Sequence, residues 1–158
     1  MEIRTDISML DQLKIQAEVL VPVIQALRKE LGEEKADALV SEALAGVSRK
    51  QAAVLAQSLE GSPIDKIETA LPLFSADGAL EVEPRTRTDT EIAFDIKGCR
   101  YAEYFRKQGL EEFGFLISCA RDRASAEGLS PDLEFERSTT IMQGADRCDF
   151  RYRLKSGK

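Results

Sequence analysis

Along residues 8 to about 60, hydrophobic side chains recur at steps of three and four, and this spacing predicts amphipathic helices. The apolar face of the first predicted helix carries Leu10, Leu13, Ala17, Leu20 and Ile24. Gly32 is expected to end this helix and Gly46 the next, with Ser48 as the N-cap of a third. Pro22 predicts either a kink in the first helix or the first turn of another one. Faces of this kind most often form a packing layer or a dimer surface.

After residue 78 the hydrophobic positions alternate with polar ones, and this period of two predicts strands. Helical spacing intervenes over residues 100–126, with a break expected at Gly109. An earlier short helix is expected to start at Ser62-Pro63, a cap followed by proline. Each predicted strand has one apolar face, which is typical of an antiparallel sheet covered on one side. The strands are predicted at residues 80–84, 91–97, 133–139 and 148–154.

These elements predict an α+β fold, with an N-terminal helical layer followed by a four-stranded antiparallel sheet with helices packed on one face. We expect a single domain over residues 1–158. In it, residues 1–74 form the helical N-terminal part, and residues 75–158 form the α+β part that carries the candidate site. A chain of 158 residues buries roughly two-thirds of its unfolded surface, so it needs no disulfide to be stable.

The composition excludes several classes of function. The chain has 28 acidic and 22 basic residues and a formal charge of −6, which argues against a nucleic-acid partner, because such partners require clustered Lys and Arg. It has no histidine, so Ser-His-Asp and Cys-His catalysis and HExxH zinc sites are excluded within this chain.

Cysteine usage and hydropathy indicate the cellular compartment. Cys99, Cys119 and Cys148 form an odd, widely spaced set without a CxxC pair, unlike a secreted disulfide scaffold. The first six residues lack the apolar stretch of a signal peptide, and no apolar run approaches the ~20 residues that cross a bilayer. We therefore expect a cytoplasmic protein with reduced thiols and without a membrane partner.

Four residues place polar or reactive groups at positions that the hydrophobic pattern predicts to be buried. Arg137 continues the apolar face of the third predicted strand, where a guanidinium needs a carboxylate from the protein or from a ligand. Cys119 and Asp122 share one face of the predicted helix, and Cys148 lies on the inward face of the last strand. If the helix packs on that face of the sheet, all four side chains converge. The alternatives for Arg137 are an internal salt bridge or a side chain that reaches water past a short strand, and the alternative for the cysteines is inert packing.

Two chemistries fit such a cluster. In the first, a cysteine thiolate attacks an electrophilic carbon while Asp122 transfers the proton, and Arg137 or a helix N-terminus lowers the thiol pKa. In the second, Cys119, Cys148 and a carboxylate hold zinc and activate water. The metal alternative is the weaker one, because the thiols lack the close spacing of zinc ligands. We therefore expect no cofactor.

The second half of the chain carries a series of short motifs. They are Gly98-Cys99-Arg100-Tyr101-Ala102, Gly114-Phe115, Cys119-Ala120-Arg121-Asp122, Phe135-Glu136-Arg137-Ser138-Thr139-Thr140, Gly144 and Cys148-Asp149-Phe150-Arg151. In order and spacing these motifs resemble the L-2-amino-thiazoline-4-carboxylic acid hydrolase family, over roughly residues 90 to 153. The helical half resembles members of that family only in a general way.

The resemblance implies that the chain opens a 2-aminothiazoline ring bearing a carboxylate by hydrolysis, to an N-carbamoyl cysteine product. It implies catalytic roles for Cys119, Asp122 and Cys148, and a clamp by Arg137 on the carboxylate of this small-molecule substrate. The further substrate-binding residues that it implies are Cys99, Tyr101, Thr139, Thr140 and Asp149.

Two other classes of function fit the same sequence. The first is a small-ligand-binding or sensory domain that uses the same pocket without chemistry. The second is an interaction protein whose N-terminal helices mediate assembly. These amphipathic helices also make a homodimer the expected form of self-association.

Overall fold

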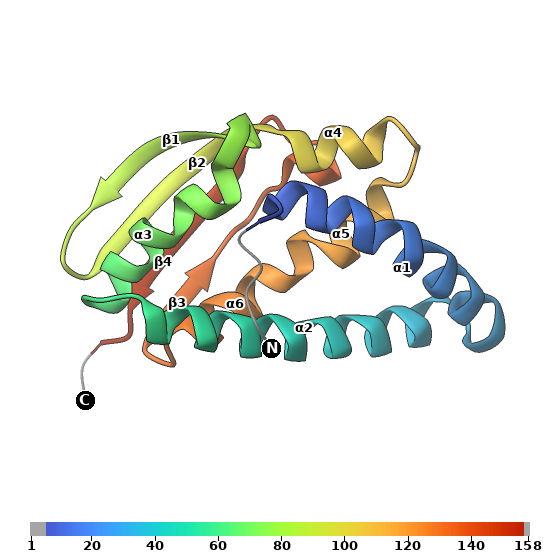
Figure 1. Ribbon diagram of the computed structural model, residues 1–158, viewed down its shortest axis with the longest axis horizontal. Coiled ribbons are helices and arrows are strands. Elements are labelled where there is room, and N and C mark those ends of the chain that lie inside the picture. The colour runs from blue at the N-terminus through green and yellow to red at the C-terminus, as the bar shows by residue number, and fades with distance from the viewer. Residues whose placement is uncertain (1–5, 157–158) are drawn as a thin grey trace.

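The amino-terminal half folds into the helical layer that the hydrophobic spacing predicts (Figure 1). In the computed structural model, which describes residues 6–156, the layer consists of α1 (Met9–Leu31), α2 (Glu33–Ser58) and α3 (Pro63–Ser75). Ser8 caps α1, because its hydroxyl accepts the backbone N–H of Asp11, and Ser62 caps α3 in the same way. Residues 1–5 lie outside the described residues. They belong to the segment in which the sequence predicts no signal peptide.

The prediction that Gly46 ends a helix and that Ser48 caps the next one is wrong. α2 continues through both residues to Ser58. A glycine inside a helix costs only about 1 kcal/mol relative to alanine, and tertiary packing outweighs this cost. Ser48 is buried and accepts a hydrogen bond from Nε of Arg121 at 2.5 Å, so it holds a distant segment instead of capping a helix. α1 likewise runs past Pro22 without giving way to another helix.

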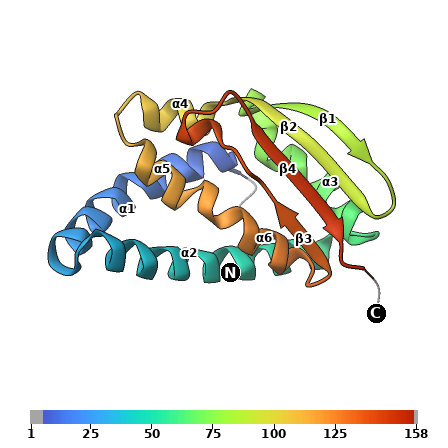
Figure 2. The same ribbon diagram turned by 180° about the vertical axis from the view of Figure 1, so that it is seen from behind.

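Within the described residues, four antiparallel strands form a sheet in the order β1-β2-β4-β3, so the last strand lies between the second and the third. The strands are β1 (Leu80–Arg87), β2 (Glu91–Cys99), β3 (Leu133–Glu136) and β4 (Cys148–Leu154). The helices cover one face of the sheet and leave the other face open, as Figures 1 and 2 show from opposite sides. The predicted α+β class, with its helices on one face of the sheet, is confirmed.

β3 is shorter than predicted and ends at Glu136 rather than Thr139. The carboxylate of Asp149 accepts the backbone N–H groups of Ser138 and Thr139, at 2.8 Å each. A side chain of β4 thus replaces the backbone partners that a longer strand would have, and the chain leaves the sheet.

The segment between β2 and β3 contains α4 (Arg100–Arg106), α5 (Glu111–Ile117), the 3-10 turn η2 (Cys119–Arg121) and α6 (Asp122–Leu129). The break predicted at Gly109 is confirmed, and its φ of 65° suits glycine. The prediction that one continuous helix carries both Cys119 and Asp122 is wrong, because α5 ends before Ser118. The Cys119 carbonyl accepts the Asp122 N–H and the guanidinium of Arg137 instead of continuing an α-helical ladder.

The core lies between the helical layer and the covered face of the sheet. Its largest completely buried apolar side chains are Ile24, Ile64, Ile96, Phe105 and Ile117. Among the helices of residues 6–156, none combines the length and the apolar character that a membrane-spanning segment needs.

Candidate functional site

An ion pair between Arg137 and Asp122 forms the centre of the candidate site. Arg137 follows β3, and Asp122 is the first residue of α6. Nη1 of Arg137 donates to the Asp122 carboxylate, and both Nη atoms donate to the Cys119 carbonyl at 3.2 Å. Only 9% of the Arg137 side-chain surface is exposed. The guanidinium therefore points inward as predicted, and the carboxylate that it requires comes from the protein itself.

The three cysteines surround this ion pair. Cys119 begins η2, and the buried Cys148 begins β4, where its Sγ accepts a backbone N–H at 3.2 Å. Cys99 is half-buried and caps α4, with its Sγ 3.4 Å from a backbone nitrogen. Burial first, and the nearby charge of Asp122 as well, raises the pKa of each thiol. The structure therefore brings together the four residues that the pattern predicts to converge, and it adds Cys99.

Burial sets the protonation of the cluster. It raises the pKa of Asp122 to about 6, although the charges of Arg137 and Arg121 act in the opposite direction. It raises the pKa of Cys148 to about 11 and the pKa of Cys119 well above its ordinary value. Because 32% of the Asp122 side-chain surface is exposed, water reaches the carboxylate. At neutral pH the thiols are protonated, whereas Asp122 is mostly ionised and titrates near the physiological range.

The thiolate chemistry predicted from the sequence requires a lowered thiol pKa, and this requirement is not met. Burial and the charge of Asp122 raise the pKa of Cys119 by more than the charge of Arg137 lowers it. Neutral thiols are poor nucleophiles, so they are suited to packing and weak hydrogen bonding rather than attack.

Two of the predicted substrate-binding side chains make internal hydrogen bonds. The hydroxyl of the buried Tyr101 donates to the Phe74 carbonyl at 3.0 Å. The Thr140 hydroxyl caps the 3-10 turn η3 (Ile141–Gln143), because it accepts the Gln143 N–H and donates to the Gln143 side-chain oxygen. Both side chains hold the local backbone in place, and their contact with a substrate stays a prediction.

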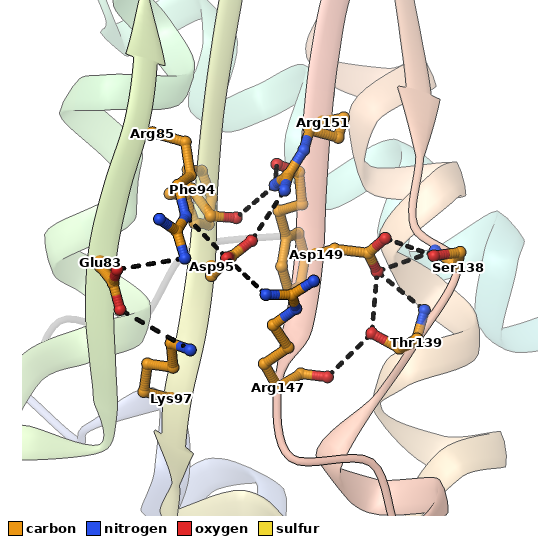
Figure 3. A network of polar contacts seen from close by, with 11 residues as sticks. Glu83, Arg85, Phe94, Asp95, Lys97, Ser138, Thr139, Arg147, Asp149 and Arg151 are labelled. Carbon is orange, nitrogen blue, oxygen red and sulfur yellow. Dashed lines mark hydrogen bonds and ion pairs between the residues drawn. The ribbon is translucent and has the colours of Figure 1, made fainter.

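Asp149 and Thr139 lie on the open face of the sheet (Figure 3). Cys148 is the neighbour of Asp149 in β4, so its side chain points to the opposite face. Asp149 accepts backbone N–H groups of Ser138 and Thr139, and the Thr139 hydroxyl donates to the Arg147 carbonyl at 2.9 Å. Burial alone would raise the pKa of Asp149, but the hydrogen bond from the Ser138 hydroxyl and those from the backbone N–H groups lower it to about 2. The structure thus separates both residues from the thiols, and substrate binding by them stays a prediction.

Sequence reasoning missed Asp95, a completely buried carboxylate on the open face of the sheet. Arg85 Nε donates to it at 2.7 Å and Arg151 Nη2 at 2.8 Å, as Figure 3 shows. Burial by itself would raise the pKa of Asp95, but hydrogen bonds from Arg151 and Arg85 hold it below its ordinary value. The ionised carboxylate ties β1, β2 and β4 together. The available signal was an acid in the middle of a strand whose predicted neighbours carry arginine.

Two hollows of the described chain lie away from the thiols and from Asp122. The first has a volume of about 200 Å³ and lies between α1 and α4. The second has a volume of about 660 Å³ and is lined by α5, by η3 and by the turn that joins α1 to α2. Within residues 6–156, no three Cys, Asp or Glu side chains are placed to hold a metal ion. The zinc alternative therefore lacks a preformed site.

A family of known proteins matches most of the chain. The model of the L-2-amino-thiazoline-4-carboxylic acid hydrolase family matches residues 12–152. No curated protein matches the chain.

Two solved structures resemble this one. The phenol-responsive sensory domain of the transcription activator PoxR, solved with phenol, is 16% identical with a TM-score of 0.56, and the match covers 85% of this chain and 72% of that one. Trafficking protein particle complex subunit 3 from Naegleria fowleri, covalently bound to palmitic acid, is 16% identical with a TM-score of 0.49, and the match covers 90% of this chain and 97% of that one. The first likeness shows a shared fold alone.

Proposed function

Because this chain belongs to the L-2-amino-thiazoline-4-carboxylic acid hydrolase family, we propose that it opens a small cyclic amidine or amide ring of the 2-aminothiazoline carboxylate type by hydrolysis. Membership in the family supports a hydrolase-like activity. The observation that carries the proposal is the Asp122 carboxylate, which pairs with a buried arginine and has a pKa of about 6. A carboxylate with such a pKa is suited to act first as general base and then as general acid.

The proposed reaction adds water to the ring carbon between nitrogen and sulfur. Asp122 accepts one proton of the water while the oxygen bonds to this carbon, and the electron pair of the carbon–nitrogen double bond moves to the ring nitrogen, so that the carbon becomes tetrahedral. The carbon–sulfur bond then breaks as the carbon–oxygen double bond forms. Asp122 returns its proton to the leaving sulfur, and the remaining hydroxyl proton passes to the ring nitrogen. The products are an N-carbamoyl cysteine and the ionised Asp122 of the starting state.

Arg137 is proposed to position Asp122 and to bind the substrate carboxylate. Its Nη atoms already contact Asp122 and the Cys119 carbonyl. Its buried Nε has no acceptor among residues 6–156, and Nη2 uses one of its two hydrogens in the bond to the Cys119 carbonyl, so the Nε–H and one Nη2–H are left for substrate oxygens. The edge of a guanidinium that carries Nε and one Nη can donate two parallel hydrogen bonds to a carboxylate.

The cysteines are proposed to act as neutral groups beside the reacting ring. With a pKa of about 11, Cys148 is ionised in only about one molecule in ten thousand at pH 7. Cys119 is also protonated, because burial raises its pKa well above the ordinary value. The proposed nucleophile is therefore water activated by Asp122, not a thiolate.

The proposal is tested with 2-amino-thiazoline-4-carboxylate and cyclic amide analogues, with the products separated by liquid chromatography. Formation of N-carbamoyl cysteine from the thiazoline supports the proposed function. If no ring is opened while a small carboxylate raises the melting temperature, the chain is a small-ligand-binding domain instead.

The rate of ring opening is expected to rise with pH around pH 6 and to become constant above about pH 7. Asp122 must be ionised to accept a proton, and its pKa is raised to about 6, so the active form is lost as the pH falls through that value. Measurement of kcat/KM across this range checks the expectation. A profile that stays level well below pH 6 would exclude Asp122 as the base.

α1 leaves an apolar stripe uncovered. Ile15, Val19 and Val23 follow one another at steps of four and expose 58%, 65% and 48% of their surface. The first turn of α1 contains the acidic Asp11, and the last turn contains the basic Lys29. An antiparallel second copy of α1 would join the two stripes and place each acidic end beside a basic end. We propose a weak dimer, because three side chains expose much less than the roughly 800 Å² per partner of a standard interface.

Val19→Arg is expected to leave the protein monomeric at concentrations where the wild type associates. The substitution puts two like charges at the centre of the two-fold contact. Sedimentation velocity over a concentration series up to about 500 μM measures the effect, since a weak dimer dissociates at micromolar concentrations. Val54→Arg on α2 is the matched control, because Val54 is also exposed, at 39%. A wild type that stays monomeric throughout this series would contradict the dimer.

A further inference from the structure

Four aromatic rings pack together on the covered face of the sheet, those of Phe94, Phe135, Phe150 and Tyr152. The centre of the Phe150 ring lies 5.3 Å from that of Phe94 and 5.9 Å from that of Phe135. The other three residues expose no more than 8% of their surface, whereas Phe150 is only half-buried, although it belongs to a central strand. Solvent therefore reaches the covered face of the sheet at Phe150.

The end of β3 explains why this position is accessible. The last pair between β3 and β4 is Glu136 with Arg151, so Phe150 has no strand residue opposite it on that side. The first residue after β3 is Arg137, and its guanidinium carbon lies 5.6 Å from the centre of the Phe150 ring and 5.7 Å from that of Phe135. An accessible ring and a guanidinium thus lie side by side at the point where the chain leaves the sheet.

This guanidinium has a donor that the described protein does not satisfy. Only 9% of the Arg137 side-chain surface is exposed, and its buried Nε has no acceptor among residues 6–156. Buried donors normally have an acceptor, so the Nε–H indicates the place of a ligand oxygen. The neighbouring Asp122 exposes 32% of its side-chain surface, so solvent also reaches the ion pair.

The short distance between ring and guanidinium limits the kind of ligand that contacts both. An oxygen that accepts a hydrogen bond lies about 2.9 Å from Nε. Ligand atoms in van der Waals contact with Phe150 lie about 3.5–4.0 Å from its ring carbons. Because the guanidinium carbon is 5.6 Å from the centre of this ring, a ligand whose carboxylate is bonded directly to its own ring meets both conditions.

We propose that Phe150 is a specificity-determining residue and that the site takes a small unsaturated ring with a carboxylate bonded directly to it. Arg137 binds the carboxylate through its Nε–H, and the accessible part of Phe150 contacts the ring of the ligand. A 2-aminothiazoline carboxylate belongs to this class. That choice of substrate rests on the proposed function, whereas the contact between Phe150 and a bound ring does not.

The contact is tested first in the wild type, with thiazole-4-carboxylate as the probe. This compound has its carboxylate on an aromatic ring and lacks the amidine, so it binds without turnover. Nuclear Overhauser effects are expected between its ring protons and those of Phe150. The proposal is wrong if these effects run only to other residues. It is also wrong if the probe does not bind at about 10 mM, where a site of even millimolar affinity is mostly occupied.

Phe150→Leu is expected to weaken the binding of thiazole-4-carboxylate by about three- to tenfold, since leucine stays apolar but lacks the aromatic ring. The binding of acetate is expected to stay at the wild-type value, because acetate uses Arg137 alone. NMR shift titrations measure both affinities. Phe113→Leu is the matched control, since this buried ring on α5 also contacts an arginine, Arg28, at 4.5 Å. Equal losses for both carboxylates in Phe150→Leu would show that the ring acts only through Arg137 and would overturn the proposal.

The kinetics of ring opening separate this proposal from the proposed function. Phe150→Leu is expected to raise KM about three- to tenfold and to keep kcat within about twofold, because the ring contact is made before and during the reaction. If the wild type opens no ring but the probe contacts Phe150 as expected, the proposed function fails and the binding site stands. If the ring opens but no Overhauser effect reaches Phe150, the opposite holds. The wild-type Overhauser measurement also decides the matter if Phe150→Leu does not fold.

Discussion

Asp122→Asn is expected to lower kcat for ring opening by about 10²- to 10⁴-fold, the usual effect of losing a general base or acid. Asparagine has nearly the size of aspartate and can still accept a hydrogen bond from Arg137, but it cannot take a proton from water. The loss is therefore expected in kcat rather than in KM. Circular dichroism shows whether the variant stays folded, which matters because Arg137 loses its charged partner.

The cysteine variants are the decisive comparison. Cys119→Ala and Cys148→Ala are expected to keep kcat within about tenfold of the wild type, since a protonated thiol contributes packing rather than a nucleophile. Asp146→Asn changes an exposed carboxylate and serves as the matched control for Asp122→Asn. Full turnover in Asp122→Asn, together with none in a cysteine variant, would assign the chemistry to the thiols instead.

Gly128→Ala is expected to destabilise the protein by about 1–3 kcal/mol, which is typical of overpacking. A Cβ at Gly128 would lie 2.2 Å from the backbone oxygen of Arg49, so α6 and α2 would have to separate. In a domain of this size the melting temperature is expected to fall by about 2–12 °C. Because α6 begins with Asp122, the displacement also moves the carboxylate, and the rate of ring opening is expected to fall with the stability.

Gly46→Ala is the control, and it is expected to stabilise the protein where Gly128→Ala destabilises it. Gly46 lies inside α2, and a Cβ there meets no described atom within 4 Å. Alanine is the better helix former, so this variant is expected to gain up to about 1 kcal/mol. Thermal unfolding of both variants measures the contrast. If Gly128→Ala melts at the wild-type temperature, the close approach of α6 to α2 does not limit stability.

The hydrophobic spacing by itself determined which segments become helices and which become strands. The structure confirms the helix predicted from the steps of three and four in α1. It also confirms the strand predicted from the alternation of Ile92, Phe94 and Ile96 in β2. The inward direction of Arg137 was also predictable, because it continues the face of its strand. These features depend on residues close together in sequence, since burying one face of an element requires only a local period.

The ends of the elements depended on partners far away in the sequence. α2 runs through Gly46, where local propensity predicts an end. α5 ends at Ile117, and the carbonyl of Cys119, two residues further on, accepts a hydrogen bond from the guanidinium of Arg137. β3 stops at Glu136, because the Asp149 side chain takes the next backbone donors. Local patterns contain no information about these contacts.

The sequence by itself determined the α+β architecture, the kinds of residue at the candidate site and, through its motifs, the family. Only the tertiary structure decided that Arg137 pairs with Asp122, that the thiols stay protonated and that Asp149 lies on the other face of the sheet. The reason is physical. A repeating pattern belongs to neighbouring residues, whereas an ion pair or a shifted pKa depends on which distant groups the fold brings within a few ångströms and how much water it removes between them.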